Sequence, residues 1–547
     1  MGSQAKLLRT LMATALAVIG VFAFASVAQA DTYTVTKEAD TADGTCDSDC
    51  SLREAVIAAN STEADDTIVL DPGHYNLTIE GSEEDQAADG DLDLLDNGSI
   101  TITGTSARNT IIDGLGTADA DNLIESERVF DVYARASISN VTIQGGSQFG
   151  GGGGIRIRGL MGPIQTPAGF VGSASLSLDH VSVSGNEVSG SGGGIENDGG
   201  DLTISRSLLS NNFAESDGGA VVSYDGATTH IENSTIQDNT ADSNAGCAGI
   251  GAVTGFNADI TLLNDTIVDN VNLDGTCSAD PTAGLASEDF SSDGVSEEPS
   301  GSMTVQNTVV ANNQTLGPVE GEGTLSVGGT PELNNCAGPG ITSAGYNIED
   351  DTDCSFANTG DLQNTDPKLG GLDNNGGQTD TRALLDGSPA INTAGPGAPA
   401  TDQRDVSRPQ GAASDIGAFE VEVPAPPTTQ PVQPVQQQQK PGAPKLAVAG
   451  VRRACTSSAR VSVKVKATVA SGTTLKQVRV TLDGKRLYTS KKGTFTLKVN
   501  ATRLKAGRHR LRVTVLDSAG GSKTTTKVLA RCAQAKPKAK VQPRFTG

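Results

Sequence analysis

The sequence has no tryptophan, only four methionines and four histidines, and few aromatic residues, which make up 3% of its 547 positions. The lack of tryptophan removes the largest aromatic side chain that a sugar ring can stack on. No Cys-x2-Cys pair occurs, and no histidine lies near a cysteine pair, which argues against zinc. Beyond the N-terminal segment, no apolar run reaches the ~18 residues that a membrane-spanning helix needs. The sequence therefore argues against both a zinc centre and a membrane span in the body of the chain.

Glycine is abundant, with 66 residues. Segments rich in Val, Ile, Thr and Ser alternate with turns rich in Gly, Asn and Asp, a pattern typical of short β-strands. The length allows two domains or one long repetitive domain. We therefore predict an all-β chain.

The first 30 residues have the features of a secretory signal peptide. Lys6 and Arg9 precede an apolar run from Leu11 to Val27, and the small-x-small triplet at residues 28–30 follows it. The run is short for a membrane anchor and is followed at once by a cleavage site. We expect residues 1–30 to be removed and the mature chain to be exported.

Export to an oxidising compartment makes the eight cysteines candidates for four disulfides. Their distribution along the chain suggests that sequence neighbours pair, and this connectivity is a hypothesis. The pairs are Cys46 with Cys50, Cys247 with Cys277, Cys336 with Cys354, and Cys455 with Cys532.

The net charge of −25 conceals an asymmetry between two parts of the chain. Residues 31–442 carry a net charge of −50, whereas residues 443–547 carry +23. Opposite charges on two parts of one chain indicate different partners, or an attraction of each part for the other.

The acidic part contains a repeat. Six segments share apolar residues at positions 0, 2 and 7 and a turn residue at position 10, and position 0 returns after 26 and 27 residues in the clearest copies. The segments are Ala136/Ile138/Ile143/Gly146, Leu176/Leu178/Val183/Asn186, Leu202/Ile204/Leu209/Asn212, Thr229/Ile231/Ile236/Asn239, Ile260/Leu262/Ile267/Asn270, and Met303/Val305/Val310/Asn313.

This template predicts three short strands in each coil. Positions 0 and 2 lie on one face of a first strand, position 7 lies on a second, and an apolar strand follows a glycine cluster. Asparagine at position 10 suits the bend, because it tolerates the left-handed conformation and its amide can bond a neighbouring coil. Residues 31–420 are thus predicted to form a right-handed parallel β-helix. An antiparallel sandwich does not explain the period, and the leucine ladder of leucine-rich repeats is missing.

The first coil needs a cover, and residues 31–60 supply one. Ser51 with Glu54 three places later forms the pattern of a capping box, and Leu52, Ala55, Val56 and Ala59 fall on one helix face. We expect a short capping helix there.

Residues 50–55 read Cys-Ser-Leu-Arg-Glu-Ala, which resembles the signature of the CSLREA-domain family. Residues 385–392, 402–409 and 415–420 resemble the choice-of-anchor region that ends many such proteins, and we expect residues 379–420 to close the helix. The resemblance covers most of residues 31–420. It implies an exported, surface-type β-helix and assigns no reaction.

A Pro/Gln-rich linker is predicted over residues 421–444, because such a composition cannot pack a core. Residues 445–535 then alternate apolar and basic residues in short strands, as expected for a small Ig-like β-sandwich. Part of this segment, residues 506–520, resembles the last hairpin of bacterial Ig-like surface domains. A basic tail follows at residues 536–547.

Catalytic residues are hard to find in the acidic part. The best candidates for lyase chemistry are Arg156 and Arg158, which lie two apart on an expected strand and therefore point the same way. Their alternative role is to pair with acidic neighbours on a surface strand. No cofactor is expected, but calcium candidates are Asp89, Asp91 and Asp93, or Asp47 and Asp49.

The densest group of mixed charges is interpreted as ion pairs and hydrogen bonds that close the last coil. It consists of Asp402, Arg404, Arg408, Asp415 and Glu420.

The sequence favours an exported, cell-surface β-helical protein of binding or adhesion type, without catalysis. Its expected partners are polysaccharide or cell-envelope polyanions, to which the basic module would attach. Nucleic acid is disfavoured, because the chain is exported and the basic module has few aromatic residues. The alternative is a polysaccharide lyase or glycoside hydrolase built on the β-helix of the pectin lyases.

Overall fold

The structure, a computed structural model, divides the chain into two compact units. Unit 1 comprises residues Met1–Ala425 and unit 2 residues Pro426–Gly547. The described residues are 30–81, 86–95, 98–116, 127–159, 174–242, 251–273, 282–288, 301–318, 327–423, 444–451, 458, 460–469, 473–482, 485–504, 507–518 and 522–531. Residues 1–29 of the predicted signal peptide, the tail and nearly all of the linker lie outside these residues. Among the helices described, none is long and apolar enough to cross a membrane.

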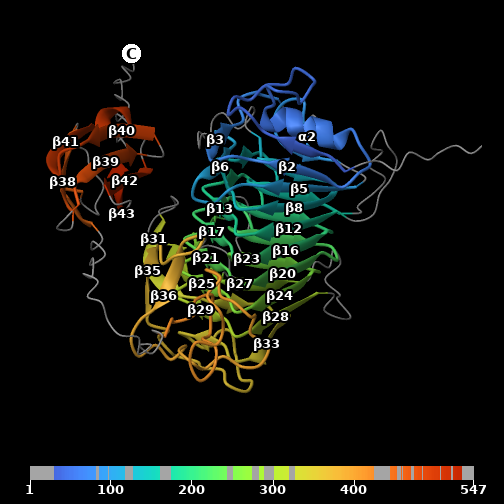
Figure 1. Cartoon of the computed structure of the whole chain (residues 1–547). Coiled ribbons are helices and arrows are strands. Elements are labelled where there is room, and N and C mark those ends of the chain that lie inside the picture. Colours follow the sequence, from blue (N-terminus) through green and yellow to red (C-terminus); the bar gives the residue numbers. More distant parts are fainter. Residues whose placement is uncertain are drawn as a thin grey trace, which may run out of the picture. The chain divides into compact units, whose positions relative to one another are not determined.

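Unit 1 is a parallel β-helix whose strands stack into four sheets (Figure 1). Sheet A contains β1 (Thr32–Thr34), β2 (Asp66–Val69), β5 (Ser99–Thr103), β8 (Arg135–Ser139), β12 (Ser175–Asp179), β16 (Asp201–Ser205), β20 (Thr228–Glu232), β24 (Asp259–Leu263), β28 (Ser302–Gln306) and β33 (Ile341–Gly345). Sheet B contains β3 (Gly73–Asn76), β6 (Thr110–Asp113), β9 (Thr142–Gln144), β13 (Ser182–Ser184), β17 (Leu208–Ser210), β21 (Thr235–Gln237), β25 (Thr266–Val268), β29 (Val309–Ala311) and β34 (Ile348–Glu349).

The other two sheets complete each coil. Sheet C contains β4 (Leu92–Leu94), β7 (Phe130–Val132), β11 (Ile155–Arg158), β15 (Ile195–Asp198), β19 (Val221–Tyr224), β23 (Val253–Phe256), β27 (Leu285–Glu288) and β32 (Cys336–Ala337). Sheet D contains β10 (Ser147–Gln148), β14 (Glu187–Val188), β18 (Phe213–Ala214), β22 (Thr240–Ala241), β26 (Val271–Asn272), β30 (Gln314–Pro318) and β31 (Val327–Leu333). Among the strand pairs described in these four sheets, only the last, β30 with β31, is antiparallel.

A coil therefore passes through sheets A, B, D and C in turn, and the expectation of three strands per coil is wrong. The additional strand is the two-residue strand of sheet D, such as Glu187–Val188. A strand this short shows no alternation of apolar and polar residues, so periodicity cannot reveal it.

The predicted row of core residues is confirmed. Register pairs Ile138 with Leu178, Leu178 with Ile204, and so on through six successive coils. Every member of the row is fully buried: Ile138, Leu178, Ile204, Ile231, Leu262 and Val305.

Buried asparagines form a ladder along the bend between sheets B and D. The Nδ2 of Asn212 donates to the Oδ1 of Asn239 at 2.9 Å and to the backbone oxygen of Val183 at 3.0 Å, while its backbone N–H donates to the same Oδ1. Equivalent side-chain bonds link the predicted turn asparagines, and Asn335 extends the ladder by one coil. The ladder consists of Asn186, Asn212, Asn239, Asn270, Asn313 and Asn335.

The proposed left-handed backbone lies one residue earlier than expected. Positive φ angles occur at Gly185, Asn211, Asp238, Asp269 and Asn312, each directly before a ladder asparagine. The preceding residue makes the turn, so the ladder residue is free to direct its amide along the stack.

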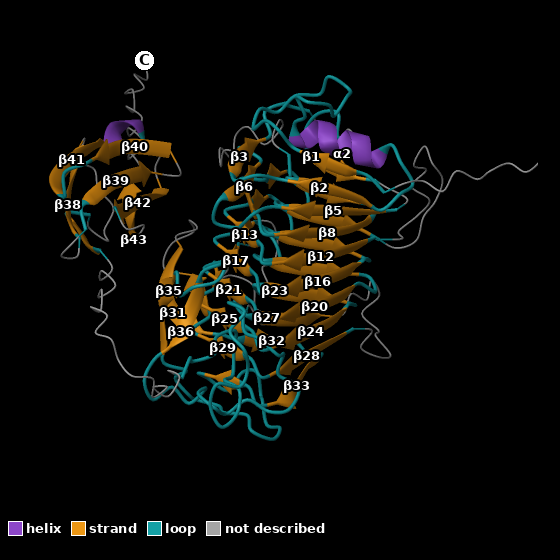
Figure 2. Cartoon of the chain, viewed as in Figure 1, coloured by secondary structure: helices purple, strands orange, loops and turns teal. Residues whose placement is uncertain are grey.

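The N-terminal end is covered by helix α2 (Leu52–Asn60), as Figure 2 shows. The predicted capping box is present, since Ser51 Oγ accepts from the Glu54 N–H and Glu54 Oε2 accepts from the Ser51 N–H. Arg53 is fully buried, pairs with Asp40 at 2.8 Å and donates to three backbone oxygens of residues 87–91. These bonds fasten the helix to the first coils.

The C-terminal region of unit 1 contains the antiparallel pair β35 (Leu369–Asp373) and β36 (Thr381–Leu384) and then irregular chain. The predicted internal ion pairs are present, with Arg404 on Asp402 at 2.7 Å and Arg408 on Glu420 at 3.2 Å. All four side chains are buried.

However, this region does not simply close the last coil. It runs back along sheet B, where Gln403 bonds Ser207 and Thr235, and Asp380 reaches Arg108 near the other end. Ala390 and Ile416 pack there on Val268 and Val309. Apolar side chains on the outside of sheet B therefore attract this segment, a feature that the repeat pattern does not reveal.

Two of the four expected disulfides lie within the described residues. Cys46 bonds Cys50 and Cys336 bonds Cys354. The other two suggested pairs involve residues 247, 277, 455 and 532, which lie outside the described residues and stay a hypothesis.

Unit 2 is a β-sandwich, as predicted. A three-stranded sheet, here called sheet G, has the order β37 (Lys445–Ala449), β38 (Arg460–Thr468), β41 (Thr494–Asn500). A four-stranded sheet, sheet H, has the order β40 (Lys485–Ser490), β39 (Leu475–Leu482), β42 (Gly507–Asp517), β43 (Ser522–Arg531). A separate apolar core, including Val463, Val480 and Val513, lies inside unit 2.

The ladder makes a testable prediction about stability. Asn239→Ala removes the acceptor of the Asn212 amide and backbone N–H and leaves buried polar groups without partners. At ~1–3 kcal/mol for each such group, we expect a loss of several kcal/mol in the free energy of unfolding. Asp201→Ala, on the exposed side of β16, is the control and should change stability by less than ~0.5 kcal/mol. Equal effects in a urea titration would contradict a structural role for the ladder.

Candidate functional site

The outer side of sheet C brings together charged and aromatic residues. Its inward residues, such as Ile155, Ile157 and Val221, belong to the core, so the alternate residues point outward. We call these outward residues the sheet C face: Asp93, Asp131, Arg156, Arg158, Glu196, Asp198, Val222, Tyr224, Thr254, Phe256, Ala286 and Glu288.

Strand register arranges this face in rows that run along the helix axis. One row places Arg158, Asp198, Tyr224, Phe256 and Glu288 side by side on successive coils. A long row of side chains about one strand spacing apart can follow an extended ligand.

Arg156 and Arg158 point the same way, as predicted, and both are paired with acids. Arg158 binds Asp131 through Nε and Nη2, at 2.9 and 2.7 Å, and its guanidinium lies 5.1 Å from the Tyr133 ring centre. Arg156 lies 3.2 Å from Asp198 and 3.6 Å from Glu196. The alternative role considered for these arginines, pairing with acidic neighbours, is therefore the observed one.

Asp131 of the sheet C face also belongs to a buried cluster of charged residues. Arg128 pairs with Asp91 at 3.1 Å and with Asp131 at 2.9 Å. Burial raises the pKa of Asp91 to about 7 and outweighs the attraction of Arg128. Arg128 is shared between Asp91 and Asp131, and Asp131 is also bound by Arg158. Burial also raises the pKa of Glu196.

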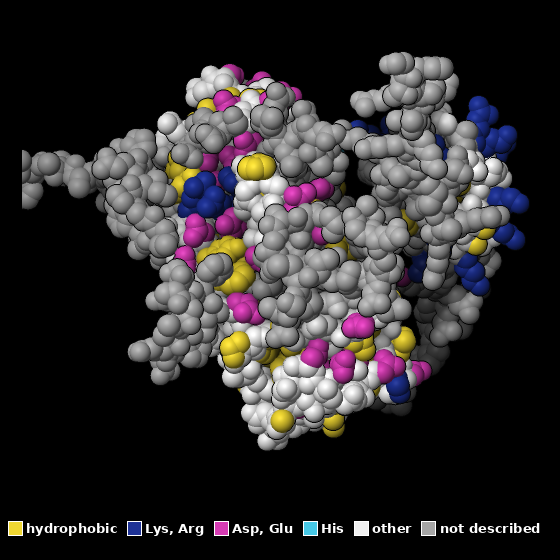
Figure 3. Space-filling model, turned by 180° about the vertical axis from the view of Figure 1, so that it is seen from behind, with side chains coloured by type: hydrophobic (Ala, Val, Ile, Leu, Met, Phe, Trp, Pro, Cys, Tyr) yellow, Lys and Arg dark blue, Asp and Glu magenta, His cyan; other side chains and the backbone are white. Residues whose placement is uncertain are grey.

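An aromatic pair adjoins the charged residues. The rings of Tyr224 and Phe256 stack with their centres 5.2 Å apart and an angle of 8° between planes. Tyr224 is partly exposed, while Phe256 is buried. Figure 3 shows a side of the β-helix on which basic and acidic side chains lie next to hydrophobic ones.

The carboxylates that come together include two of the calcium candidates named from the sequence, Asp91 and Asp93. Asp91 and Asp93 are joined by Asp131, with ligand atoms within 4.8 Å of one another, and Asp89 is not part of the group. Arg128 and Arg158 already bind two of these acids. Because two guanidiniums supply the positive charge, the group does not fit a calcium ion. Asp47 caps the Asp49 N–H, and Asp49 pairs with Lys37.

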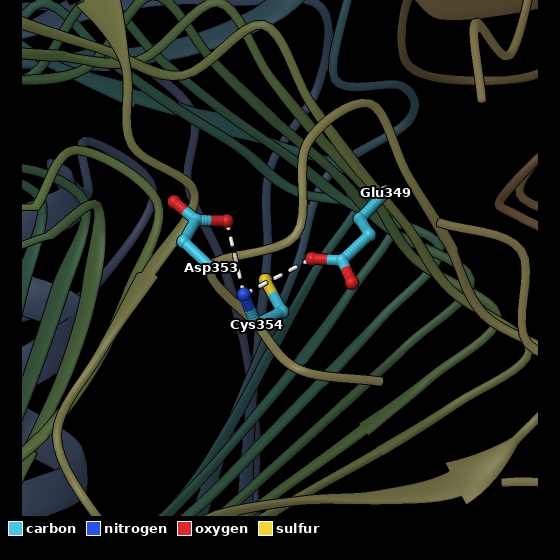
Figure 4. A group of neighbouring side chains, drawn as sticks. All are labelled: Glu349, Asp353 and Cys354. Atoms are coloured by element: carbon cyan, nitrogen blue, oxygen red, sulfur yellow. Dashed lines mark hydrogen bonds between the residues drawn. The ribbon is translucent and has the colours of Figure 1, made fainter. Parts of the chain in front are cut away.

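A second group with metal-like spacing is Glu349, Asp353 and Cys354 (Figure 4). The Cys354 sulfur is bonded to Cys336, so no thiolate is available. Both carboxylates accept backbone N–H bonds, Glu349 from Cys354 and Phe356, and Asp353 from Cys336 and Cys354. This group therefore stabilises turns near the last coil.

Sequence reasoning did not identify Asp131, Tyr224 or Phe256 as site residues. The only sequence signal for the aromatic pair is its position. Tyr224 and Phe256 are each the fourth residue of a strand, β19 and β23, that follows a glycine-containing segment. These residues become neighbours through stacking of coils.

Comparison with known proteins gives two findings. Residues 454–513 match the family model of the bacterial Ig domain. Among solved structures, pectate lyase Pel9A is similar, at 16% identity and a TM-score of 0.35, over 72% of this chain and 97% of that one. No curated protein matches. A TM-score this low carries no argument, so the class rests on the strands themselves: a parallel β-helix protein with an Ig-like domain.

The pKa of Asp91 makes a prediction about pH. Its value in the folded chain is about 7, against an ordinary value of 3.8, so its contribution to stability is present below about pH 4 and is lost as the pH rises to about 7. Asp91→Asn abolishes this dependence. At 1.36 kcal/mol per pKa unit, the advantage of wild type over the variant should shrink by about 2–4 kcal/mol between pH 4 and 8. Urea unfolding at both pH values measures it. A constant difference would contradict the raised pKa.

Proposed function

We propose that unit 1 is a non-catalytic binding module that holds an extended polysaccharide along the sheet C face. The observation that carries this proposal is the row of Arg158, Asp198, Tyr224 and Phe256 on adjacent coils. Tyr224 is the partly exposed ring of this row, and an aromatic ring beside a few oriented polar groups is typical of ligand-binding sites. Charged side chains already held by neighbours are pre-organised to exchange hydrogen bonds with hydroxyl groups.

The pairing of the arginines favours binding over catalysis. A guanidinium that contacts carboxylates remains protonated and cannot accept a proton from a sugar. Asp131, Glu196 and Asp198 each contact an arginine, so these carboxylates are already held in ion pairs. The alternative, a polysaccharide lyase or glycoside hydrolase, is tested in the same experiment.

We further propose that the protein is exported and attached to the cell surface. The signal-peptide pattern at residues 1–30 and the resemblance of residues 50–55 and 385–420 to CSLREA and choice-of-anchor proteins support export. The charge of +23 on residues 443–547 supports electrostatic attachment of unit 2 to anionic envelope polymers. The acidic unit 1 would be repelled by the same polymers and remain available for its ligand.

The binding proposal is tested with a panel of polysaccharides, including polyuronates, and with absorbance of unsaturated products followed in the same wells. Wild type should bind at least one polymer without product. Tyr224→Ala should weaken that binding by about tenfold, since stacking on an aromatic ring contributes about 1 kcal/mol or more. Leu385→Ala, an exposed apolar residue elsewhere on unit 1, is the control and should bind normally. Product formation would make the protein a lyase, and absence of binding to every polymer would refute the proposal.

The attachment proposal is tested by sedimentation with isolated cell envelopes. Attraction between exposed charges weakens as the Debye length falls from about 10 Å at 0.1 M salt to about 3 Å at 1 M. The mature chain should sediment at low salt and be released near 1 M, whereas residues 31–420 alone should stay in solution. Failure of the mature chain to sediment at low salt would refute electrostatic attachment.

A further inference from the structure

The outer surface of sheet G in unit 2 carries a group of exposed cations. In sheet G, Val463, Val465 and Val499 point into the core, so the alternate residues point outward. We call this surface the lysine face. It contains five exposed cations, namely Lys445, Arg460, Lys464, Lys466 and Lys498, separated by Ser462, Thr468, Thr494, Thr496 and Asn500.

The lysine face has no acidic residue to neutralise it. Unit 2 contains two acids, Asp483 and Asp517, and neither belongs to a strand of sheet G. Within the described residues, none of the five cations forms an ion pair, and all five are exposed. The lysine face therefore presents cations that are available for a ligand.

Register places four of these cations in a row. Lys498 of β41 lies opposite Ser462 of β38. It is therefore a diagonal neighbour of Arg460 and of Lys464, which flank Ser462 on β38. Lys466 follows two residues after Lys464 on β38. Diagonal neighbours and residues two apart on a strand are both roughly 7 Å apart. Side-chain hydroxyls between the cations can donate hydrogen bonds to the same anionic groups. The row thus offers evenly spaced positive charges on a flat surface.

We infer that the lysine face binds a linear polyanion of the envelope, one that carries a carboxylate or a phosphate on each repeating unit, with the polymer laid along β38 and β41. A flat row of separated cations matches such a polymer better than a compact anion, which needs charges converging on one point. A lipid surface is a less suitable ligand than a polymer, because binding to lipid needs apolar side chains that can insert. The outward apolar residues on the strands of sheet G are only Ala447 and Ala449 of β37. This inference rests on the proposed attachment and names its surface and ligand class.

The test uses the mature full-length chain with two matched triple variants. The face variant is K464Q/K466Q/K498Q. The control variant is K476Q/K523Q/K527Q, which removes the same charge from exposed lysines of sheet H. Binding to polygalacturonate, to long-chain polyphosphate and to phosphatidylglycerol vesicles is measured from 0.05 to 0.5 M salt, and circular dichroism with thermal unfolding confirms that each variant is folded.

The face variant should bind both polymers at least about tenfold more weakly than the control variant at low salt. For the face variant, the slope of log K, where K is the binding constant, against log salt concentration should also decrease in magnitude by about 2. Each lysine that no longer contacts a flexible polyanion removes ~0.7 from this slope. Weakening with only one of the two polymers assigns the ligand as carboxylate or phosphate and supports the inference. Equal weakening in both variants, no binding of either polymer by wild type, or binding only to phosphatidylglycerol vesicles would overturn it.

Sedimentation with isolated envelopes tests this inference separately from the proposal of electrostatic attachment. If wild type sediments and the face variant sediments equally well, the inference is wrong and electrostatic attachment stands. If wild type does not sediment, the attachment proposal itself is wrong.

Discussion

The structure of unit 1 depends on satisfying the backbone groups that are buried where each coil bends. A parallel β-helix turns a corner several times per coil, and each corner interrupts the strand ladder inside a dry stack. At the bend between sheets B and D, the asparagine ladder supplies the missing hydrogen bonds. Each side-chain amide donates to a backbone oxygen of the preceding coil and to the asparagine of the following coil. A second series does the same at the bend between sheets A and B, where Ser207, Ser234 and Asp265 each accept a backbone N–H from the preceding coil.

These ladders set the register, and the register assembles the sheet C face. Once Asn212 lies over Asn239, the strands that follow are fixed in pairing, so Tyr224 lies beside Phe256. The sheet C face is therefore a consequence of interior hydrogen bonds. Its residues are free to vary in chemistry because the alternate residues of the same strands, such as Val221 and Val253, hold the core.

The two units use charge in different ways. In unit 1, arginines such as Arg53, Arg404 and Arg408 are buried. They donate to backbone oxygens as well as to carboxylates, so they connect separate segments of the chain. In unit 2, cations such as Lys464 and Lys498 project outward from exposed strand positions. Basic side chains thus connect segments inside the first unit and lie on the surface of the second.

The sequence by itself determined the features that depend on local periodicity. Alternation around Ile204 and Ile231 revealed the inward rows, the spacing of Ser51 and Glu54 revealed the capped helix, and composition separated the acidic and basic parts. It did not reveal the two-residue strands of sheet D, because a strand of two residues has no period. Only the tertiary structure decided that Asp131 joins Asp91 and Arg128, that the chain around Gln403 runs back along sheet B, and which outward residues become neighbours. Such contacts link residues tens to hundreds of positions apart, and they depend on insertion lengths and on surface complementarity, which no local pattern encodes.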